Sequence, residues 1–272
     1  MQNQERDLKL AVLIDADNVS YQYIKPIMEE IAVYGVPTIK RIYADWTRQN
    51  MNGWKSVILD HAISPIQQFN YTSGKNSSDS ALIIDAMDIL YTEQLDGFCL
   101  VSSDSDFTKL AVRLRESGKM VLGFGEQKTP NAFIAACNRF LYLEILEDNY
   151  EETGPTTNTN LADSHVEPVK EKASKKGIKP LDKATQRLIH NSIDAIADDS
   201  GWAFLADVGN VISKTDPSFD SRNFGYSKLS HLVDDLDGIE VDDRATANPN
   251  VKHIYIRNKS KAQKRNRNRK YN

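Results

Sequence analysis

The first half of the chain alternates apolar, strand-like runs with helical patterns, and this alternation constrains the fold more than any other feature. Lys9–Asp15 (KLAVLID) is a nearly continuous apolar run, which is typical of a strand covered on both faces. A helical pattern follows from Ser20 and stops at Gly35. Further strands are expected at 38–45, 66–72, 97–103, 119–125 and 140–144, and further helices at 53–63, 77–92, 105–117 and 130–137. This order predicts an α/β domain with a parallel sheet.

The composition changes sharply after this region. Residues 147–180 are polar, contain Pro and Gly and carry almost no large apolar side chains, so they cannot offset their own ordering entropy. Apolar periodicity returns at Leu181, where three helical patterns precede an alternating strand pair, the order of a winged helix. We expect a first domain at 1–146, a flexible linker at 147–180, a small winged-helix domain at 181–257 and a disordered basic tail at 258–272.

Charge is distributed unevenly along the chain. The first 150 residues hold 14 basic and 20 acidic groups, and residues 181–256 hold 7 basic and 13 acidic groups. The last sixteen residues carry eight Lys or Arg and no acid. A basic tail on an acidic body favours attraction to polyanions, although a purely solubilising tail would have the same composition.

The cysteines and the hydropathy of the chain indicate in which cellular compartment the protein is expected. Cys99 and Cys137 lie in apolar stretches without a nearby Cys or His, and we interpret them as small buried hydrophobic residues in a reducing compartment. No segment approaches the roughly 20 apolar residues of a membrane span, and the first residues contain no apolar signal core. We therefore expect a cytoplasmic protein that does not bind membranes.

Acidic residues gather where the predicted strands end. Asp15 closes the first strand, with Asp17 two residues later, Asp104 and Asp106 follow the fourth strand, and Asp79 opens the helix after the third. The carboxyl ends of parallel strands form the ligand-binding edge of such a sheet. Clustered carboxylates repel one another unless a cation offsets their charge, and oxygen ligands suit Mg²⁺ or Mn²⁺. The pattern predicts a divalent-metal site that can activate water for attack on phosphorus.

The same acidic residues also fit a structural role, and the sequence offers little support for other chemistries. Asp79, Asp104 and Asp106 each precede or open a helix, so each is also a candidate helix cap. Capping does not account for the acidic pair that follows the first strand. A nucleophilic serine would need a His base, but His61 is the only His of the first domain and falls within a predicted helix. No Gly-rich phosphate loop follows the first strand. Asp85 lies six residues after Asp79 on the same predicted helix, so we expect it at most at the periphery of the acidic site.

Several ordered segments resemble the NYN family of PIN-like nucleases, namely VLIDADN, YADW, GKNSSDSALIIDAMDILY and VSSDSDFTKLAVRLRESGKMVLGFG. The resemblance covers roughly residues 9–145 and implies a PIN-like, Rossmannoid parallel sheet with an acidic Mg²⁺ pocket. It places the catalytic, metal-binding carboxylates on Asp15, Asp79, Asp104 and Asp106. No substitution in these segments removes a carboxylate, so the resemblance implies an active enzyme.

The same resemblance implies roles for three further residues. Asn18 would orient water or a carboxylate in the catalytic site, Ser103 would be the small polar residue beside the metal, and Lys75 would meet a substrate phosphate. The implied reaction is hydrolysis of RNA that leaves a 5′-phosphate and a 3′-hydroxyl.

Residues 181–256 resemble the LOTUS domain, also called OST-HTH, a winged-helix module associated with RNA binding. The resemblance rests on the helical layout, the FLADVG stretch, the FGY turn and the closing hairpin. We expect Tyr226 and Lys228 to contact RNA, but the acidity of this domain is unfavourable for phosphate binding. A protein partner is therefore the alternative for this domain. In the tail, cations interleaved with Asn would neutralise RNA phosphates, among them Lys264, Arg265, Arg267 and Arg269.

Together these features predict a Mg²⁺- or Mn²⁺-dependent endoribonuclease whose C-terminal domain and tail recruit single-stranded or structured RNA. Two alternatives stay open. One is a non-catalytic RNA-binding adaptor whose acidic pocket holds a metal without turnover. The other is a structure-specific DNA nuclease, because sequence alone does not show what reads a 2′-hydroxyl.

Overall fold

The computed structural model describes residues 7–48, 51, 53–69, 77–147, 177–245 and 252–259. The chain divides into two compact units, Met1–Pro155 and Thr156–Asn272. Most of the predicted linker and the predicted tail from residue 260 onward lie outside the described residues. Within the part of the chain that the structure describes, no helix has the length and apolar character needed to cross a membrane.

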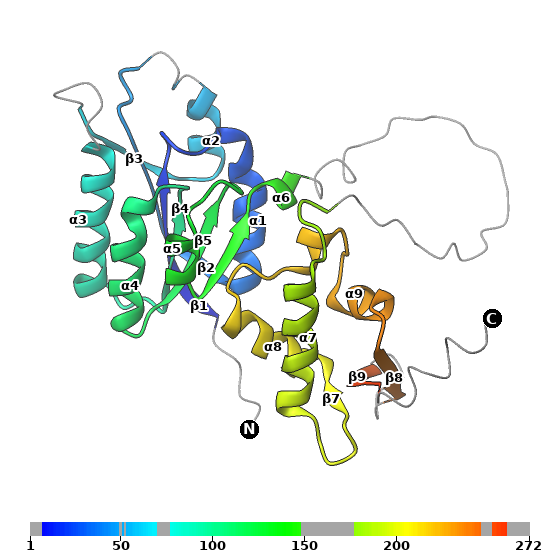
Figure 1. The fold of residues 1–272 in the computed structure, drawn as a ribbon. Coiled ribbons are helices and arrows are strands. Elements are labelled where there is room, and N and C mark those ends of the chain that lie inside the picture. The colour runs from blue at the N-terminus through cyan, green and yellow to red at the C-terminus, as the bar shows by residue number, and fades with distance from the viewer. Residues whose placement is uncertain are drawn as a thin grey trace, which may run out of the picture. The chain divides into compact units, whose positions relative to one another are not determined.

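The first unit contains a six-stranded sheet in the order β3-β2-β1-β4-β5-β6, in which every neighbouring pair is parallel (Figure 1). The direction in which successive strands are added reverses between β1 and β4, which pair directly. The predicted parallel α/β fold is thereby confirmed. The strands are β1 (Leu8–Asp15), β2 (Gly35–Ala44), β3 (Ser64–Gln67), β4 (Gly97–Val101), β5 (Met120–Gly125) and β6 (Arg139–Tyr142).

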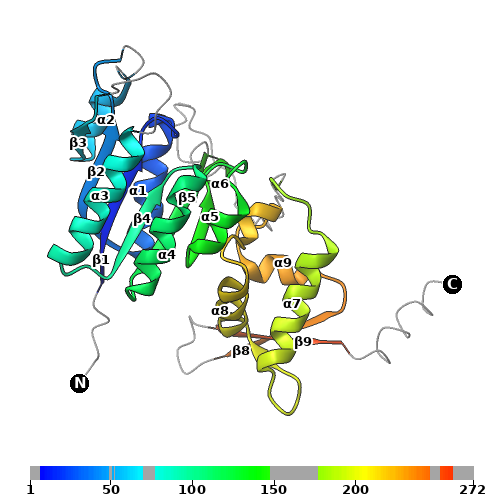
Figure 2. The same ribbon diagram turned by 60° about the vertical axis from the view of Figure 1, so that its left-hand side comes forward.

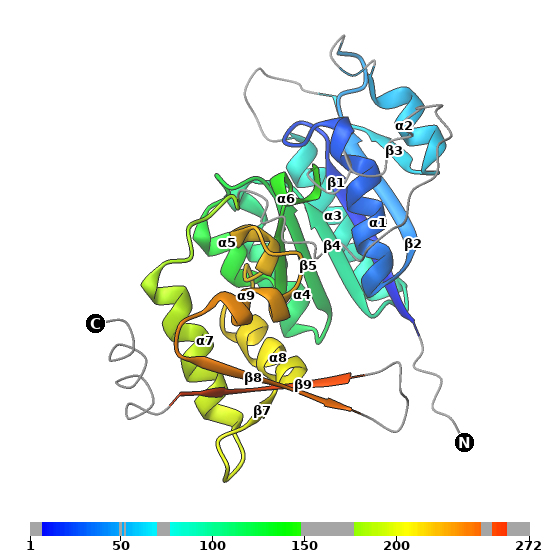
Figure 3. The ribbon, with the colours of Figure 1, turned by 90° about the vertical axis from the view of Figure 1, so that its right-hand side faces the viewer.

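Helices cover both faces of this sheet. Right-handed crossovers that run in opposite directions from the reversal point place their helices on opposite faces. Accordingly, α1 lies on one face, and α3, α4 and α5 lie on the other (Figures 2 and 3). The helical segments are η1 (Tyr21–Tyr23), α1 (Ile24–Tyr34), α2 (Trp54–Asp60), α3 (Ser77–Thr92), η3 (Ser105–Phe107), α4 (Thr108–Glu116), α5 (Asn131–Ala136) and α6 (Glu144–Glu147).

The central strands are buried on both faces, which explains their unbroken apolar sequences. All five residues of β4 are buried, and so are the last six of β1. Cys99 lies in β4 and Cys137 follows α5, and both are buried and unpaired as predicted. Burial raises the pKa of both thiols, because a thiolate would be poorly solvated there.

Several strands begin or end elsewhere than the sequence predicts; β3, for example, spans Ser64–Gln67 where a strand at 66–72 was expected. Gly35 ends α1, but it also begins β2, three residues before the predicted start at Thr38. A Cβ on Gly35 would lie 2.3 Å from the carbonyl oxygen of Leu8, so the approach of β1 requires glycine at this position. The strand β4 stops at Val101, which leaves Ser102 and Ser103 beyond the strand and at the edge of the sheet.

The described residues of the second unit have the winged-helix layout, with three α-helices and a small antiparallel sheet in the order β7-β9-β8. The third helical pattern of this region extends over about 225–236 in the sequence, but α9 begins only at Leu229, because Gly225 adopts a left-handed conformation (φ 85) that ends the preceding turn. Its elements are α7 (Lys183–Ile196), β7 (Ala203–Phe204), α8 (Leu205–Thr215), η5 (Ser221–Phe224), α9 (Leu229–Asp235), β8 (Ile239–Ala245) and β9 (Lys252–Asn258).

Candidate functional site

The site begins where β1 and β4 end side by side. The register pairs Ile14 with Val101, so Asp15 and Ser102 are the next residues at the carboxyl edge of the sheet. Asp15 is 1% exposed, and its Oδ2 accepts hydrogen bonds from Ser102 Oγ at 2.9 Å and Asn18 Nδ2 at 2.6 Å. Burial raises the pKa of Asp15, and these two hydrogen bonds oppose that rise. Asn18 therefore holds a buried carboxylate in place.

Three further carboxylates meet at the same edge. One oxygen from each of Asp79, Asp104 and Asp106 lies within 4.8 Å of the others. Asp79 lies in the first turn of α3, and Asp104 directly precedes η3. Asp104 Oδ1 also accepts a hydrogen bond from the backbone N of Asp106 at 2.9 Å. Asp104 is thus a cap as well as a member of the cluster, because capping uses only one of its two oxygens.

The repulsion among these carboxylates is clearest in the pKa of Asp79. Its side chain is buried, and burial together with repulsion from Asp15, Asp104 and Asp106 raises its pKa to about 7. Among these charges Asp15 has the largest effect, although Asp15 is not one of the three residues of the cluster. Hard carboxylate oxygens this close together fit a divalent cation, whose charge would remove the repulsion.

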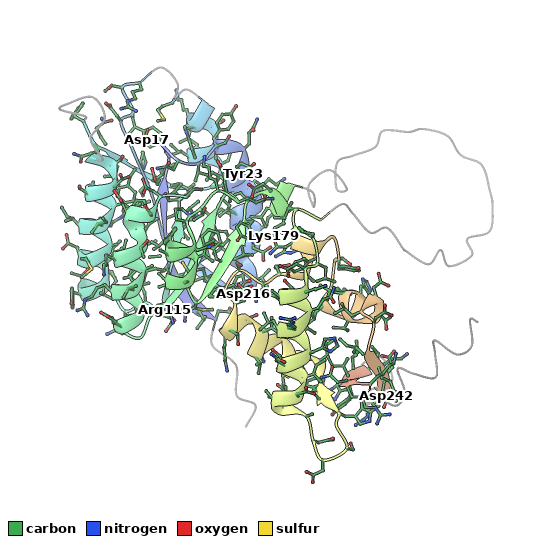
Figure 4. The ribbon with its side chains drawn as sticks, in the orientation of Figure 1. Asp17, Tyr23, Arg115, Lys179, Asp216 and Asp242 are labelled. Atoms are coloured by element: carbon green, nitrogen blue, oxygen red, sulfur yellow. The ribbon has the colours of Figure 1, made fainter. Side chains whose placement is uncertain are left out.

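Asp17 was not proposed as a site residue from the sequence, yet it lies beside the cluster. Ser78 Oγ donates to Asp17 Oδ2 at 3.1 Å, and Arg48 Nη1 lies 3.4 Å from Asp17 Oδ1. Figure 4 labels Asp17 at this end of the sheet. Arg48 Nε also lies 3.9 Å from Asp45 Oδ2, so a half-exposed cation is held at the rim of the site. The DADN sequence that contains Asp17 was the available signal.

The two serines after β4 have different partners. Ser102 Oγ both donates to Asp15 and accepts from the backbone N of Asp104 at 3.1 Å. Ser103 Oγ instead accepts from the backbone N of Glu126 at 2.9 Å, which ties the end of β4 to the loop after β5. The hydroxyl that ties the carboxylate of Asp15 to the backbone of Asp104 thus belongs to Ser102, which the sequence did not single out.

The remaining candidates of the first unit lie elsewhere. Asp85, on α3, forms an ion pair with Arg41 and accepts a hydrogen bond from the hydroxyl of Tyr43. These contacts fasten α3 to β2, so Asp85 has a structural role in the sheet. Lys75, expected to meet a substrate phosphate, lies outside the described residues.

The candidate RNA contacts of the second unit are only partly described. Tyr226 is half-buried against the hydrophobic core, and burial followed by the nearby carboxylate of Asp235 raises its pKa. Lys228 is exposed at the start of α9. The proposed tail cations Lys264, Arg265, Arg267 and Arg269 lie outside the described residues.

Comparisons with protein families identify both parts of the chain. A model of the NYN domain matches residues 9–144, and a model of the OST-HTH/LOTUS domain matches residues 177–251. These matches confirm both resemblances noted in the sequence. No curated protein matches the chain.

Three solved structures show similarity to the chain. A protein of unknown function from Vibrio parahaemolyticus is 20% identical, with 52% of this chain and 94% of that chain covered and a TM-score of 0.43. An uncharacterized protein from Nitrosomonas europaea is 30% identical, with 38% and 94% covered and a TM-score of 0.27. A protein from Chromobacterium violaceum is 40% identical, with 29% and 83% covered and a TM-score of 0.24.

Proposed function

The chain belongs to the NYN domain family, and from this membership and its acidic cluster we propose that it is a divalent-metal-dependent endoribonuclease. NYN domains are generally nuclease-like, and an NYN domain followed by an OST-HTH domain suggests cleavage or binding of RNA. The observation that carries the proposal is the approach of Asp79, Asp104 and Asp106 to within 4.8 Å at the carboxyl edge of the sheet.

Each residue of the site has a distinct task in this proposal. Asp79, Asp104 and Asp106 would hold Mg²⁺ or Mn²⁺, and the buried charge of Asp15 would strengthen their attraction for it. When bound, the cation supplies Lewis acidity and lowers the pKa of water near the scissile phosphate. Hydrolysis of this kind would leave a 5′-phosphate and a 3′-hydroxyl.

The residues around the carboxylates would position the substrate and the acids. Ser102 and Asn18 hold Asp15 through its Oδ2, so this carboxylate cannot turn away from the cluster. The side chain of Arg48 is 44% exposed beside Asp17, and its guanidinium can contact a non-bridging phosphate oxygen of RNA. The site would then combine an acidic centre with a cation at its rim.

Cleavage of labelled single-stranded RNA by the purified full chain tests this function. We expect cutting with Mn²⁺ and none with EDTA. Asp104→Asn should lower the cleavage rate more than about 100-fold, because it removes a charge that binds the cation, with little change in RNA affinity. The amide oxygen of asparagine can still cap η3, so the variant should fold normally.

Asp88→Asn is the matched control, because Asp88 is exposed on α3 and outside the cluster. It should cut at the wild-type rate. If Asp104→Asn also cuts normally, the site is assigned wrongly. If the wild-type chain binds RNA but cuts neither RNA nor matched DNA, the chain is an adaptor rather than an enzyme. Preferred cutting of DNA in a mixture of the two would identify a DNA nuclease.

A further inference from the structure

The small sheet of the second unit has one face in the hydrophobic core and one face outside it. Ala203 and Ile256 pair across β7 and β9, and both are buried in the core. Side chains alternate between the faces of a sheet, so their neighbours Phe204 and Tyr255 point to the opposite face. Trp202, which precedes β7, also lies outside the core cluster. This outer face therefore carries large aromatic rings that the core does not use.

Two arginine side chains lie against two of these rings, those of Tyr255 and Trp202. The guanidinium carbon of Arg244 lies 4.0 Å from the ring centroid of Tyr255 and 5.4 Å from that of Trp202. Arg257 lies over the same Trp202 ring at 4.5 Å. We define the aromatic face as Trp202, Phe204, Arg244, His253, Tyr255 and Arg257. Phe204 completes it, with ring centroids 5.6 Å from Tyr255 and 5.1 Å from His253.

Acidic neighbours hold both arginines in these positions. Arg244 Nε donates to Asp242 Oδ2 at 2.9 Å, and Arg257 Nε donates to Glu240 Oε2 at 2.8 Å. Figure 4 labels Asp242 on this sheet. The arginine side chains remain 40% and 30% exposed, so part of each stays in contact with solvent. Because each guanidinium is paired with an acid, the face carries little net positive charge. Its aromatic rings and guanidinium planes are flat surfaces on which other planar groups can stack.

Flat, nearly neutral surfaces of this kind fit unpaired nucleobases better than a phosphate backbone. Bases of single-stranded RNA stack on aromatic rings and on guanidinium planes. The charge needed for the backbone is supplied by the sequence that follows directly. After β9 ends at Asn258, residues 259–272 contain seven Lys or Arg and no acid. Stacking surface and phosphate-binding charge are thus adjacent in the chain.

We propose that the aromatic face is a stacking platform for single-stranded RNA. The choice of RNA as the ligand rests on the proposed function, whereas the location rests on the ring and guanidinium geometry. The platform assigns RNA contacts to Trp202 and Tyr255, which the sequence did not single out.

RNA binding by the full chain tests the proposal, measured by fluorescence anisotropy in EDTA so that no cleavage interferes. The probe is a labelled oligoadenylate of about 16 nucleotides, the upper end of single-strand site sizes. Trp202→Leu and Tyr255→Leu keep an apolar side chain but remove the ring, so each should weaken binding about tenfold. The dependence of affinity on salt should keep its slope, because neither change removes a charge.

Tyr91→Leu is the matched control, because Tyr91 is 68% exposed on α3 of the other unit. It should bind as tightly as the wild type. Arg257→Lys provides a second test if a ring variant does not fold. It keeps the charge and the contact with Glu240 but loses the planar guanidinium, and it should bind several-fold more weakly.

The outcomes separate this proposal from the proposed enzyme activity. Wild-type affinity in folded Trp202→Leu, Tyr255→Leu and Arg257→Lys would overturn the platform and leave this face to a protein partner. A lower salt slope in the leucine variants would also overturn it, because stacking releases no counterions. If these variants lose binding while the wild type never cuts with Mn²⁺, the platform stands and the nuclease function fails.

Discussion

At the scale of single residues, Asp79 shows how a buried carboxylate reports on its neighbours. A free aspartate has a pKa of 3.8, whereas burial and the surrounding carboxylates raise the pKa of Asp79 to about 7. Between these values the folded chain keeps a proton that the unfolded chain releases. The contribution of Asp79 to the stability of the folded state is therefore fully present below about pH 4, and it is lost as the pH rises through about 7.

Asp79→Asn tests this reasoning directly. In excess EDTA, we expect the variant to melt at a higher temperature than the wild type at pH 8, because the repulsion among ionised carboxylates is relieved. The difference should disappear near pH 4, where Asp79 is protonated. Thermal melting followed by circular dichroism at both pH values measures it. Asp88→Asn on the same helix should show no such dependence, and a gain for Asp79→Asn that is equal at both pH values would refute the explanation.

The sequence predicted the acids of this site better than their partners. Asp15, Asp104 and Asp106 were located because carboxylates placed where parallel strands end must share one edge of the sheet. Asp79 was placed there because its helix begins at the same edge. Ser102 was not found, because its contact with Asp15 depends on where β4 stops, and the strand was predicted to run two residues too far. Such contacts depend on register and strand length rather than on residue type.

At the scale of elements, long periodic segments were predicted well and short ones poorly. The helix α3 spans Ser77–Thr92, as expected from its sixteen residues of helical pattern. The strand β7 has two residues and was not predicted, because a two-residue strand has no detectable alternation. Its position is fixed by pairing with β9, a contact between segments about 50 residues apart in the sequence. The outer aromatic face depends on that pairing.

Gly35 joins α1 to β2, and we expect this position to tolerate substitution poorly. A Cβ at this position would lie 2.3 Å from the backbone oxygen of Leu8, and a backbone atom cannot move without shifting β1 against β2. Gly35→Ala should lower the free energy of unfolding by about 1–3 kcal/mol, the usual cost of overpacking. Urea denaturation measures this change in the first unit.

Gly209→Ala is the control for that experiment. Its Cβ would meet only a side-chain atom of Leu229, at 3.3 Å, and it lies within α8, where alanine is favoured by up to about 1 kcal/mol. We expect an unchanged or slightly higher stability. Equal losses in the two variants would show that contact with Leu8 is not the cause.

At the scale of the whole molecule, charge and chemistry are divided between different parts of the chain. The described acids of the first unit form a site suited to a cation, and the second unit offers an aromatic face with paired arginines. Neither of these two sites is basic in the described part of the chain, although RNA binding generally draws on basic groups. The sequence carries basic groups elsewhere, in the last sixteen residues with their eight Lys or Arg.

Removal of residues 260–272 should therefore reduce the salt dependence of RNA binding more than any other change in the chain. This deletion removes six Lys or Arg and leaves β9 intact. If four of the six contact phosphates, the slope of log affinity against log salt concentration should become shallower by about 3 for single-stranded RNA. Anisotropy titrations in EDTA at several salt concentrations measure the slope. A variant with a Gly/Ser tail of the same length separates charge from length, and it should behave like the deletion. An unchanged slope in both would show that the tail is solubilising, and RNA would then have to be held by the folded units alone.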